Sequence, residues 1–185
     1  ARGRLVFVDG AYNAARSNIP AGVEFATLAE AGSSHLADGA TDPIAALNLA
    51  FMSDGAVLTF KAGSNVDAPV ELLFITTGAQ TASYATHNVI VLEDGASATV
   101  METHLGGAGE YLSNSVTQIH LGENTRLDRV KIQEEGLEGV HLSNTVVHLA
   151  ASAHFKDFTI AMGGRATRQH GLITLEGECS ESQIS

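Results

Sequence analysis

One pattern occurs twice in this chain, first as Ile119-His-Leu-Gly-Glu-Asn-Thr-Arg-Leu-Asp-Arg-Val-Lys-Ile132 and then as Val147-His-Leu-Ala-Ala-Ser-Ala-His-Phe-Lys-Asp-Phe-Thr-Ile160. A related stretch, Val91-Leu-Glu-Asp-Gly-Ala-Ser-Ala-Thr-Val-Met101, precedes them, with Leu92 in the position of Leu121. A fixed period of about 28 residues is typical of a solenoid, in which each repeat forms one rung that stacks on the next. Residues one period apart are therefore expected to be neighbours in space.

The rungs are expected to consist of β-strands. From residue 56 onward, short β-rich runs alternate with Gly/Asn/Asp/Ser turns, and no helix signal recurs. Weaker copies extend the series: an earlier rung contains Val57–Phe60 and Val66–Val70, and a later, unfinished rung contains Leu172–Leu175. Since tight two-residue hairpin turns are scarce, the pattern favours a parallel β-helix over residues 56–185, with rungs of about 28 residues and an incomplete C-terminal end.

Residues 1–55 are predicted to form a short mixed α/β segment that precedes the coil. It opens with a strand that runs into a turn, Arg4–Gly10, and contains a helix over residues 43–52. Asp42 is placed to cap this helix, and Pro43 suits its first position. Ile44, Leu47 and Phe51 are expected to share one face of the helix.

The repeat also predicts a register for charged side chains. Leu127-Asp-Arg-Val130 aligns with Phe155-Lys-Asp-Phe158, which sets Asp128 against Lys156 and Arg129 against Asp157. Both pairs combine opposite charges, each worth roughly 0.2–1 kcal/mol. We expect a corner of the coil here, with Leu127 and Val130 facing inward on either side of it.

Composition excludes several classes of function. A net charge of −11 without a basic run argues against nucleic-acid and anionic-membrane binding. No apolar stretch reaches the roughly 18 residues that span a bilayer. The single cysteine, Cys179, fits a reducing cytoplasm. Because the chain starts without Met and stops within a rung, we expect a fragment of a longer protein.

Histidines supply two candidate metal sites. His120 and His148 occupy the same slot of successive rungs and should stack on the outer surface, where two imidazoles can share a metal ion or respond to pH. No carboxylate is clearly placed to complete that site, and a solvated or interface-facing surface is the preferred interpretation. His87, Glu93 and His104 flank a β-rich stretch as in cupin metal sites, but without the His-x-His element.

The remaining candidates are weaker. Gln133-Glu134-Glu135 offers paired carboxylates for acid/base chemistry, but Gly136 favours an exposed loop. Gly163-Gly164-Arg165 lacks the helix and lysine of a phosphate-binding loop and is interpreted as a tight turn. Cys179 lies among acidic residues in a polar turn, which disfavours a reactive thiolate. The residues alone therefore assign no catalytic, cofactor-binding or metal-binding position.

An ordered series of motifs resembles the SufD family of iron–sulfur cluster assembly proteins and, less closely, its paralogue SufB. Its members are Asp42–Asn48, Asp54–Val57, Leu92–Ala96, Leu112–Thr117, Leu127–Glu135, His141-Leu142, Gly163–Arg168 and Leu175–Glu178. The Leu-x-Asn-Ser-Val-Thr and Gln-Glu-Glu stretches look more like SufD than SufB. The resemblance covers nearly the whole chain.

This resemblance implies a right-handed parallel β-helix that acts as a non-catalytic scaffold. Proteins of this family pair with SufB and bind the ATPase SufC, and their complex handles an iron–sulfur cluster, with ATP on SufC. The family's cluster-related histidine and its SufC-docking segment would lie beyond residue 185. His120, His148 and Cys179 match none of the family's site residues, so no cofactor is expected on this stretch.

Other functions stay open at this point. A β-helix enzyme acting on carbohydrate would need clustered carboxylates or basic residues on one outer face. A cupin-like metal-binding module would bind a stoichiometric metal ion. A homodimer through an exposed edge of the coil is a further expectation, since a last rung near Leu172–Cys179 should pair with something.

Overall fold

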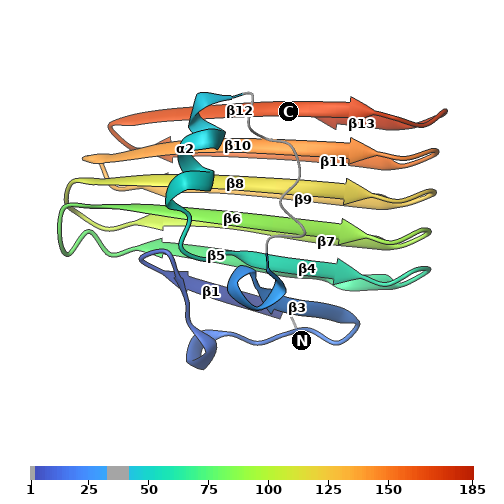
Figure 1. Ribbon diagram of the computed structural model, residues 1–185, viewed down its shortest axis with the longest axis horizontal. Helices are drawn as coiled ribbons and strands as arrows, with labels where there is room; N and C mark the ends of the chain where they lie inside the picture. Colours follow the sequence, from blue (N-terminus) through green and yellow to red (C-terminus); the bar gives the residue numbers. More distant parts are fainter. Residues whose placement is uncertain (1–2, 33–41) are drawn as a thin grey trace.

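The computed structural model describes residues 3–32 and 42–185, which form a parallel β-solenoid of about four turns (Figure 1). Each full turn consists of a strand in one sheet, a tight turn, and a strand in a second sheet that lies behind the first. The front sheet contains β3 (Val23–Thr27), β4 (Ala56–Phe60), β6 (Ala82–Leu92), β8 (Tyr111–Leu121), β10 (Gly139–Leu149) and β12 (Ala166–Leu175). The second contains β1 (Gly3–Val8), β2 (Ala11–Tyr12), β5 (Asn65–Thr76), β7 (Ser97–Gly106), β9 (Arg126–Glu135), β11 (His154–Gly163) and β13 (Glu181–Ile184).

The register of the rungs confirms the repeat found in the sequence. Val147 pairs with Ile119 on β8, and Phe155 pairs with Leu127 on β9, as the alignment of the two copies predicts. Leu121 pairs with Leu92, which confirms the alignment of the third copy. The spacing between partners varies along the coil, from 32 residues between Val57 and Val89 to 26 between Val140 and Ala166, because the turns differ in length. β5 and β7 also shift their register between Val66 and Val70.

The described residues up to Thr27 extend the coil at its N-terminal end. β1 adds to the second sheet by parallel pairing with β5, and β3 adds to the front sheet by antiparallel pairing with β4. β2 folds back on β1 through the turn at Asp9-Gly10, where both residues have positive φ. A 3-10 turn, η1 (Ala14–Arg16), and a short helix, α1 (Leu28–Ala31), complete this part of the described chain.

Helix α2 (Pro43–Phe51) lies across the outer face of the front sheet (Figure 1). Asp42 caps it by accepting the backbone N–H groups of Ile44 and Ala45 at 2.8 and 3.2 Å, as its sequence predicts. The same carboxylate forms an ion pair of 2.7 Å with Arg168 of β12. Asp42 therefore ties the start of the helix to a strand far along the chain.

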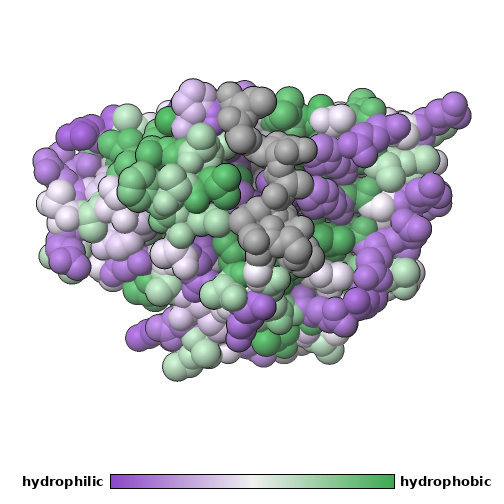
Figure 2. Space-filling view, in the orientation of Figure 1, coloured by the Kyte–Doolittle hydropathy of each residue, from purple (hydrophilic) through white to green (hydrophobic). Residues whose placement is uncertain are grey.

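The face by which α2 packs differs from the expected one. Leu47 and Phe51 are exposed, and the residues buried against the sheet are Ala45 and Asn48. The Asn48 amide donates hydrogen bonds to two backbone carbonyls, those of Thr86 on β6 at 2.9 Å and Asn114 on β8 at 3.0 Å. A small residue and an amide let the helix lie close to the strands, which leaves its larger apolar side chains at the surface (Figure 2).

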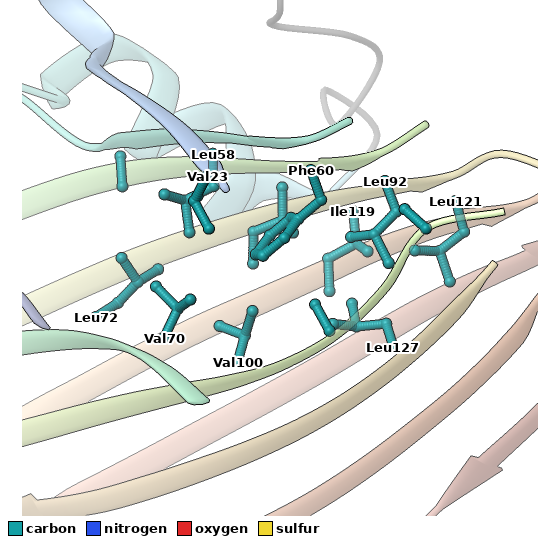
Figure 3. Packing of buried hydrophobic residues seen from close by; sticks show 14 of the residues in the cluster. Val23, Leu58, Phe60, Val70, Leu72, Leu92, Val100, Ile119, Leu121 and Leu127 are labelled. Atoms are coloured by element: carbon teal, nitrogen blue, oxygen red, sulfur yellow. The ribbon is translucent and has the colours of Figure 1, made fainter. Parts of the chain in front are cut away.

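One half of the coil interior is an apolar core. Leu58, Phe60, Leu92, Ile119 and Leu121 of the front sheet point toward apolar side chains of the second sheet (Figure 3). These residues lie next to the turns that connect each front strand to the following strand behind it. At roughly 1.5–3 kcal/mol for each fully buried large aliphatic or phenyl side chain, this column is the main source of stability for the stacked rungs.

The corner expected at Asp128-Arg129 is not formed. β9 continues through it as a regular strand, so that Leu127 and Arg129 both face inward while Val130 faces outward. The register prediction is confirmed, since Asp128 pairs with Lys156 and Arg129 with Asp157 along the strands. Only the second pair forms an ion pair among the described residues, at 3.0 Å, whereas the Asp128 carboxylate lies 3.8 Å from Arg126 on its own strand.

No helix in the described residues is long and apolar enough to cross a membrane.

Candidate functional site inside the coil

The other half of the coil interior is polar and charged. Alternation along β7, β9 and β10 directs one face of each strand into the coil, and beyond the apolar column these inward positions carry ionisable groups. We call the buried side chains that meet there the interior cluster; it consists of Glu102, His104, Tyr111, Arg129, Lys131, Glu135 and His141. All seven are at most 5% exposed, so their charges must be compensated within the protein.

Glu102 of β7 is the centre of the ionic half of this cluster. Arg129 donates to one of its oxygens from Nη2 at 2.7 Å and from Nε at 3.2 Å. Lys131 Nζ lies 3.7 Å from the other oxygen, and Thr117 of β8 donates a further hydrogen bond at 3.1 Å. Arg129 also reaches Asp157 on β11, so that the ionic contacts join three successive rungs of the second sheet.

The interior sets the protonation of these groups. Burial raises the pKa of Glu102, but the positive charges of Arg129 and Lys131 outweigh it and hold that pKa well below its ordinary range. Burial lowers the pKa of Lys131 to about 8, against the opposing attraction of Glu102. Lys131, hydrogen-bonded to Ser143 and surrounded by protein, therefore holds its proton less tightly than an exposed lysine.

The second half of the cluster combines two histidines with a carboxylate. His141 Nδ1 lies 3.0 Å from Glu135 Oε1, and Tyr111 donates to Glu135 Oε2 at 2.5 Å. The His104 ring meets the His141 ring edge-on, with centroids 4.6 Å apart, and its Nε2 lies 2.8 Å from Glu102 Oε1. One possible ligand atom each from His104, Glu135 and His141 lies within 4.8 Å of the other two.

Both histidines are held neutral. Burial lowers the pKa of His141 to about 4, more than the hydrogen bond to Glu135 raises it. Burial likewise lowers the pKa of His104, against the hydrogen bond to Glu102. Burial raises the pKa of Glu135, but its bonds with His141 and Tyr111 more than reverse this, so the carboxylate stays ionised. Two neutral imidazoles beside a carboxylate form a donor set suited to a divalent transition-metal ion.

A cavity of about 600 Å³ lies beside the cluster, toward the C-terminal rung. Arg129, Lys131 and Ser143 form its inner wall, and Thr167 and Gln169 of β12 line it farther out. Gln133, fully buried on the same strand as Lys131, has a side-chain nitrogen without a hydrogen-bond partner in the described part of the chain. The cluster therefore borders a space that water or an ion can enter.

The surface histidine pair is confirmed in geometry. His120 and His148 are register partners on β8 and β10, and their rings stack at 5.3 Å with an angle of 8°. The sequence places no carboxylate clearly beside this pair, and the structure adds one, since Glu176 Oε1 lies 2.7 Å from His148 Nδ1. Glu176 follows β12 directly, where its distance from the histidine depends on the course of a turn.

The cupin-like trio is not brought together. His87 lies on the outer face of β6 against Asn48, with 3.1 Å between Nδ1 and Oδ1. Glu93 lies in an exposed turn, where it pairs with Lys61 at 3.2 Å. Only His104 points into the coil, so these three residues form no common site.

The exposed loop expected at Gln133-Glu134-Glu135 was wrong. β9 runs through all three residues, which buries Gln133 and Glu135 inside the coil and leaves Glu134 outside. Gly136 does end the strand, but β9 continues as far as Glu135, so the turn begins after the residues that were expected to form it. The sequence does contain a signal for this strand, because inward and outward positions continue to alternate from Leu127 onward. The signal was missed because the inward residues after Leu127 are polar instead of apolar.

The last two candidates lie in turns. Gly163 and Gly164 have φ of 74° and 79° and lead from β11 into β12, which confirms a tight turn. Cys179 is exposed, with a positive φ of 59°, in the turn between β12 and β13. Neither stretch contributes to the interior cluster.

Comparison of the sequence with known proteins finds matches in one family. The family model described as SUF system FeS cluster assembly, SufBD core domain, matches residues 74–185. A SufBD family iron–sulfur cluster assembly protein of Synechocystis is 24% identical over 98% of this chain and 45% of its own length. The iron–sulfur cluster assembly protein SufD of Escherichia coli is 28% identical over 98% of this chain and 44% of its own length. The chain thus spans less than half the length of these relatives.

Proposed function

Since the chain belongs to the SufBD family, we propose that it takes part in iron–sulfur cluster assembly as the coil portion of a non-catalytic, SufD-like scaffold subunit. In this proposal the protein that contains it pairs with a SufB-like paralogue and a SufC-like ATPase, and the iron–sulfur cluster is the cargo of the complex. The observation that carries the proposal is the match of the core-domain model to residues 74–185, which include every strand from β6 to β13.

The architecture supports a scaffold. Continuous parallel ladders join the rungs, and two ion pairs, Glu102 with Arg129 (buried) and Arg129 with Asp157 (partly buried), connect neighbouring strands of the second sheet. Such a coil is stiff along its axis, because each rung is fixed to the next by a full row of backbone hydrogen bonds. A stiff body can hold two partners at a constant separation.

Two exposed apolar surfaces support protein contacts. On β11, Phe158, Ile160 and Met162 stand at alternate positions on the outer face of the second sheet, with exposures of 49%, 37% and 46%. On α2, Leu49 and Phe51 form part of the apolar patch visible on the opposite side (Figure 2). Apolar side chains grouped in this way are typical of protein-binding surfaces.

We also propose a cytoplasmic location, which the presence of a single cysteine in the whole sequence supports.

Co-purification tests the proposal. The protein that contains this chain, tagged and co-expressed with SufB-like and SufC-like proteins of the same cell, is expected to retain both on an affinity column. Phe158→Asp and Phe51→Asp place one charge on each apolar surface, and each is the control for the other. We expect one of them to reduce recovery of a partner at least tenfold while the other leaves it unchanged. Absence of both partners from the wild-type eluate would rule the scaffold out.

A further inference from the structure

We propose that Lys131 is a covalent binding site for small aldehydes with an apolar tail, which it captures as an imine inside the cavity beside the interior cluster. This role goes beyond the scaffold function and does not depend on it, because it concerns one amine and the space in front of it. A lysine that forms imines needs a desolvated amine, often beside another cation, and room for the carbonyl compound. Lys131 has all of these.

The cavity has the size and the lining for an amphipathic small molecule. It measures about 600 Å³, within the usual range for ligand sites, and it spans both halves of the coil interior. Val147, Phe155 and Ile173 line its apolar end, whereas Lys131 and Ser143 line its polar end. Since Val147 and Ser143 lie four residues apart on β10, the two ends are separated by roughly 13 Å. A short apolar tail with a carbonyl head matches this arrangement.

Solvent reaches the cavity from the side of the last rung. Ala161 of β11 and Thr167 and Gln169 of β12 line the cavity and are exposed. Lys131 itself is only 1% exposed, so its amine is screened from bulk water while its side chain borders this space. A small molecule can therefore enter without disturbing the apolar core.

The contacts of the amine leave it loosely held. Lys131 Nζ is hydrogen-bonded to Ser143 and lies 3.7 Å from Glu102 Oε1, too far for a hydrogen bond. Arg129 makes the close ion pair with Glu102, at 2.7 Å, and it also places a second positive charge beside the lysine. The other titratable groups whose charges act on or respond to Lys131 are Asp157 on β11, His104 on β7 and His141 on β10.

These surroundings make part of the amine neutral at physiological pH. Burial lowers the pKa of Lys131 to about 8, and the charge of Arg129 adds to this, against the attraction of Glu102 and Asp157. With that pKa, about one tenth of the amine is neutral at pH 7, against well under one thousandth for an ordinary lysine of pKa about 10.4. Only the neutral amine attacks a carbonyl group, so Lys131 is activated relative to a surface lysine.

Imine formation balances without any further reagent. The amine nitrogen attacks the carbonyl carbon, a C–N bond forms, and the carbonyl oxygen takes up one amine proton. The Ser143 hydroxyl, hydrogen-bonded to Nζ, can relay this proton. The C–O bond then breaks, and the oxygen leaves as water with the second amine proton, which leaves a C=N bond. No electrons are exchanged with an outside reagent, so the step needs neither oxidant nor reductant.

Reductive trapping tests the site. The protein that contains this chain is incubated near neutral pH with hexanal and cyanoborohydride, which reduces the imine to a stable secondary amine, and labelled peptides are quantified by mass spectrometry. We expect label at Lys131 at least tenfold faster than at Lys61 and Lys156, the other lysines of this chain, which are both exposed. Glyceraldehyde is the control probe: because it lacks an apolar tail, the ratio of label at Lys131 to label at Lys156 should fall at least threefold.

The pH profile distinguishes an activated amine from a merely accessible one. Labelling of Lys131 should rise with pH and level off near pH 8. Hydrogen bonds with Glu24 and Glu93 raise the pKa of Lys61, so its labelling should still be rising well above that pH.

A variant tests the role of the cavity. Ala161→Phe fills part of the space without changing a contact of Lys131, so it should slow labelling of Lys131 at least tenfold and leave that of Lys156 unchanged. The wild-type comparisons stand by themselves if this variant fails to fold. Labelling of Lys131 no faster than that of Lys61, the same pH profile for both, or undiminished labelling of Lys131 in folded Ala161→Phe would each overturn the proposal.

Discussion

Replacing Glu102 by Gln is expected to be among the most damaging conservative changes in this protein. The substitution keeps the shape of the side chain but removes the charge that faces Arg129 at 2.7 Å and Lys131 at 3.7 Å. It also turns an amide N–H₂ toward Arg129 or Lys131, which can only donate. Breaking a buried charge pair in this way typically costs about 3–5 kcal/mol.

That cost is large against the whole stability of a domain, which is usually about 5–15 kcal/mol. For a chain of this length, 1 kcal/mol corresponds to a shift in Tm of about 2–4 °C, so we expect Glu102→Gln to lower Tm by roughly 6–20 °C. Urea denaturation followed by circular dichroism measures the free energy of unfolding directly. Glu134→Gln is the matched control, because Glu134 lies on the exposed face of β9, and it should change stability by no more than about 0.5 kcal/mol.

A double variant separates the loss of attraction from the loss of packing. Glu102→Leu combined with Arg129→Met is expected to lower the free energy of unfolding by less than the sum of the losses for Glu102→Leu and Arg129→Met alone. The double variant leaves neither charge buried without its partner. A loss below about 1 kcal/mol for Glu102→Gln, or costs that simply add in the double variant, would refute the assignment of the buried ionic contacts as the link between rungs.

The remaining predictions concern the cap, the turns and the tyrosine. Asp42→Ala should lower the free energy of unfolding by about 1–2 kcal/mol at neutral pH, as measured by urea denaturation. Burial raises the pKa of Asp42, but hydrogen bonding outweighs this and lowers the pKa to about 2, so the stabilisation is complete above about pH 4 and should vanish as the pH falls toward 2. A stability difference that stays constant with pH would contradict this prediction. Gly55→Ala should lower Tm, because its Cβ would collide with the backbone carbonyl oxygen of His87 and prevent β4 from aligning with β6. Gly171→Ala is the control, since Gly171 has open space around it and the change should leave Tm nearly unchanged. Equal Tm values for the two variants would argue against the register. Tyr111→Phe should destabilise by about 1–3 kcal/mol in the same denaturation assay, because it deprives the Gly136 N–H of its acceptor, and an unchanged midpoint would show that water replaces the hydroxyl.

The repeat in the sequence is sufficient to align the rungs. The pairing of Ile119 with Val147 and of His120 with His148 follows directly from the repeat, because stacked strands place equivalent residues side by side. What the period leaves open is the side of the strand on which a residue lies. The repeat pairs Arg129 correctly with Asp157, yet the sequence pattern places it at the surface, since a buried arginine contradicts the usual alternation of apolar and polar positions.

The interior cluster could not be predicted from the sequence for a related reason. His104, Glu135 and His141 come from three strands and meet only because the two sheets face each other. Contacts between facing sheets have no fixed sequence spacing, so the repeat does not reveal them. Their polar character made the strand ends resemble loops. The burial of these charged residues can be recognised only when the positions of both sheets are known, because each charge is stabilised by a partner on another strand.

Native mass spectrometry of the protein that contains this chain tests the central claim of a SufD-like scaffold most directly. Co-expressed with its SufB-like and SufC-like proteins and sprayed from a non-denaturing buffer, it should appear in a single complex whose mass includes all three. A spectrum in which it is present only alone, or only with copies of itself, while the SufB-like and SufC-like proteins assemble without it, would contradict the account.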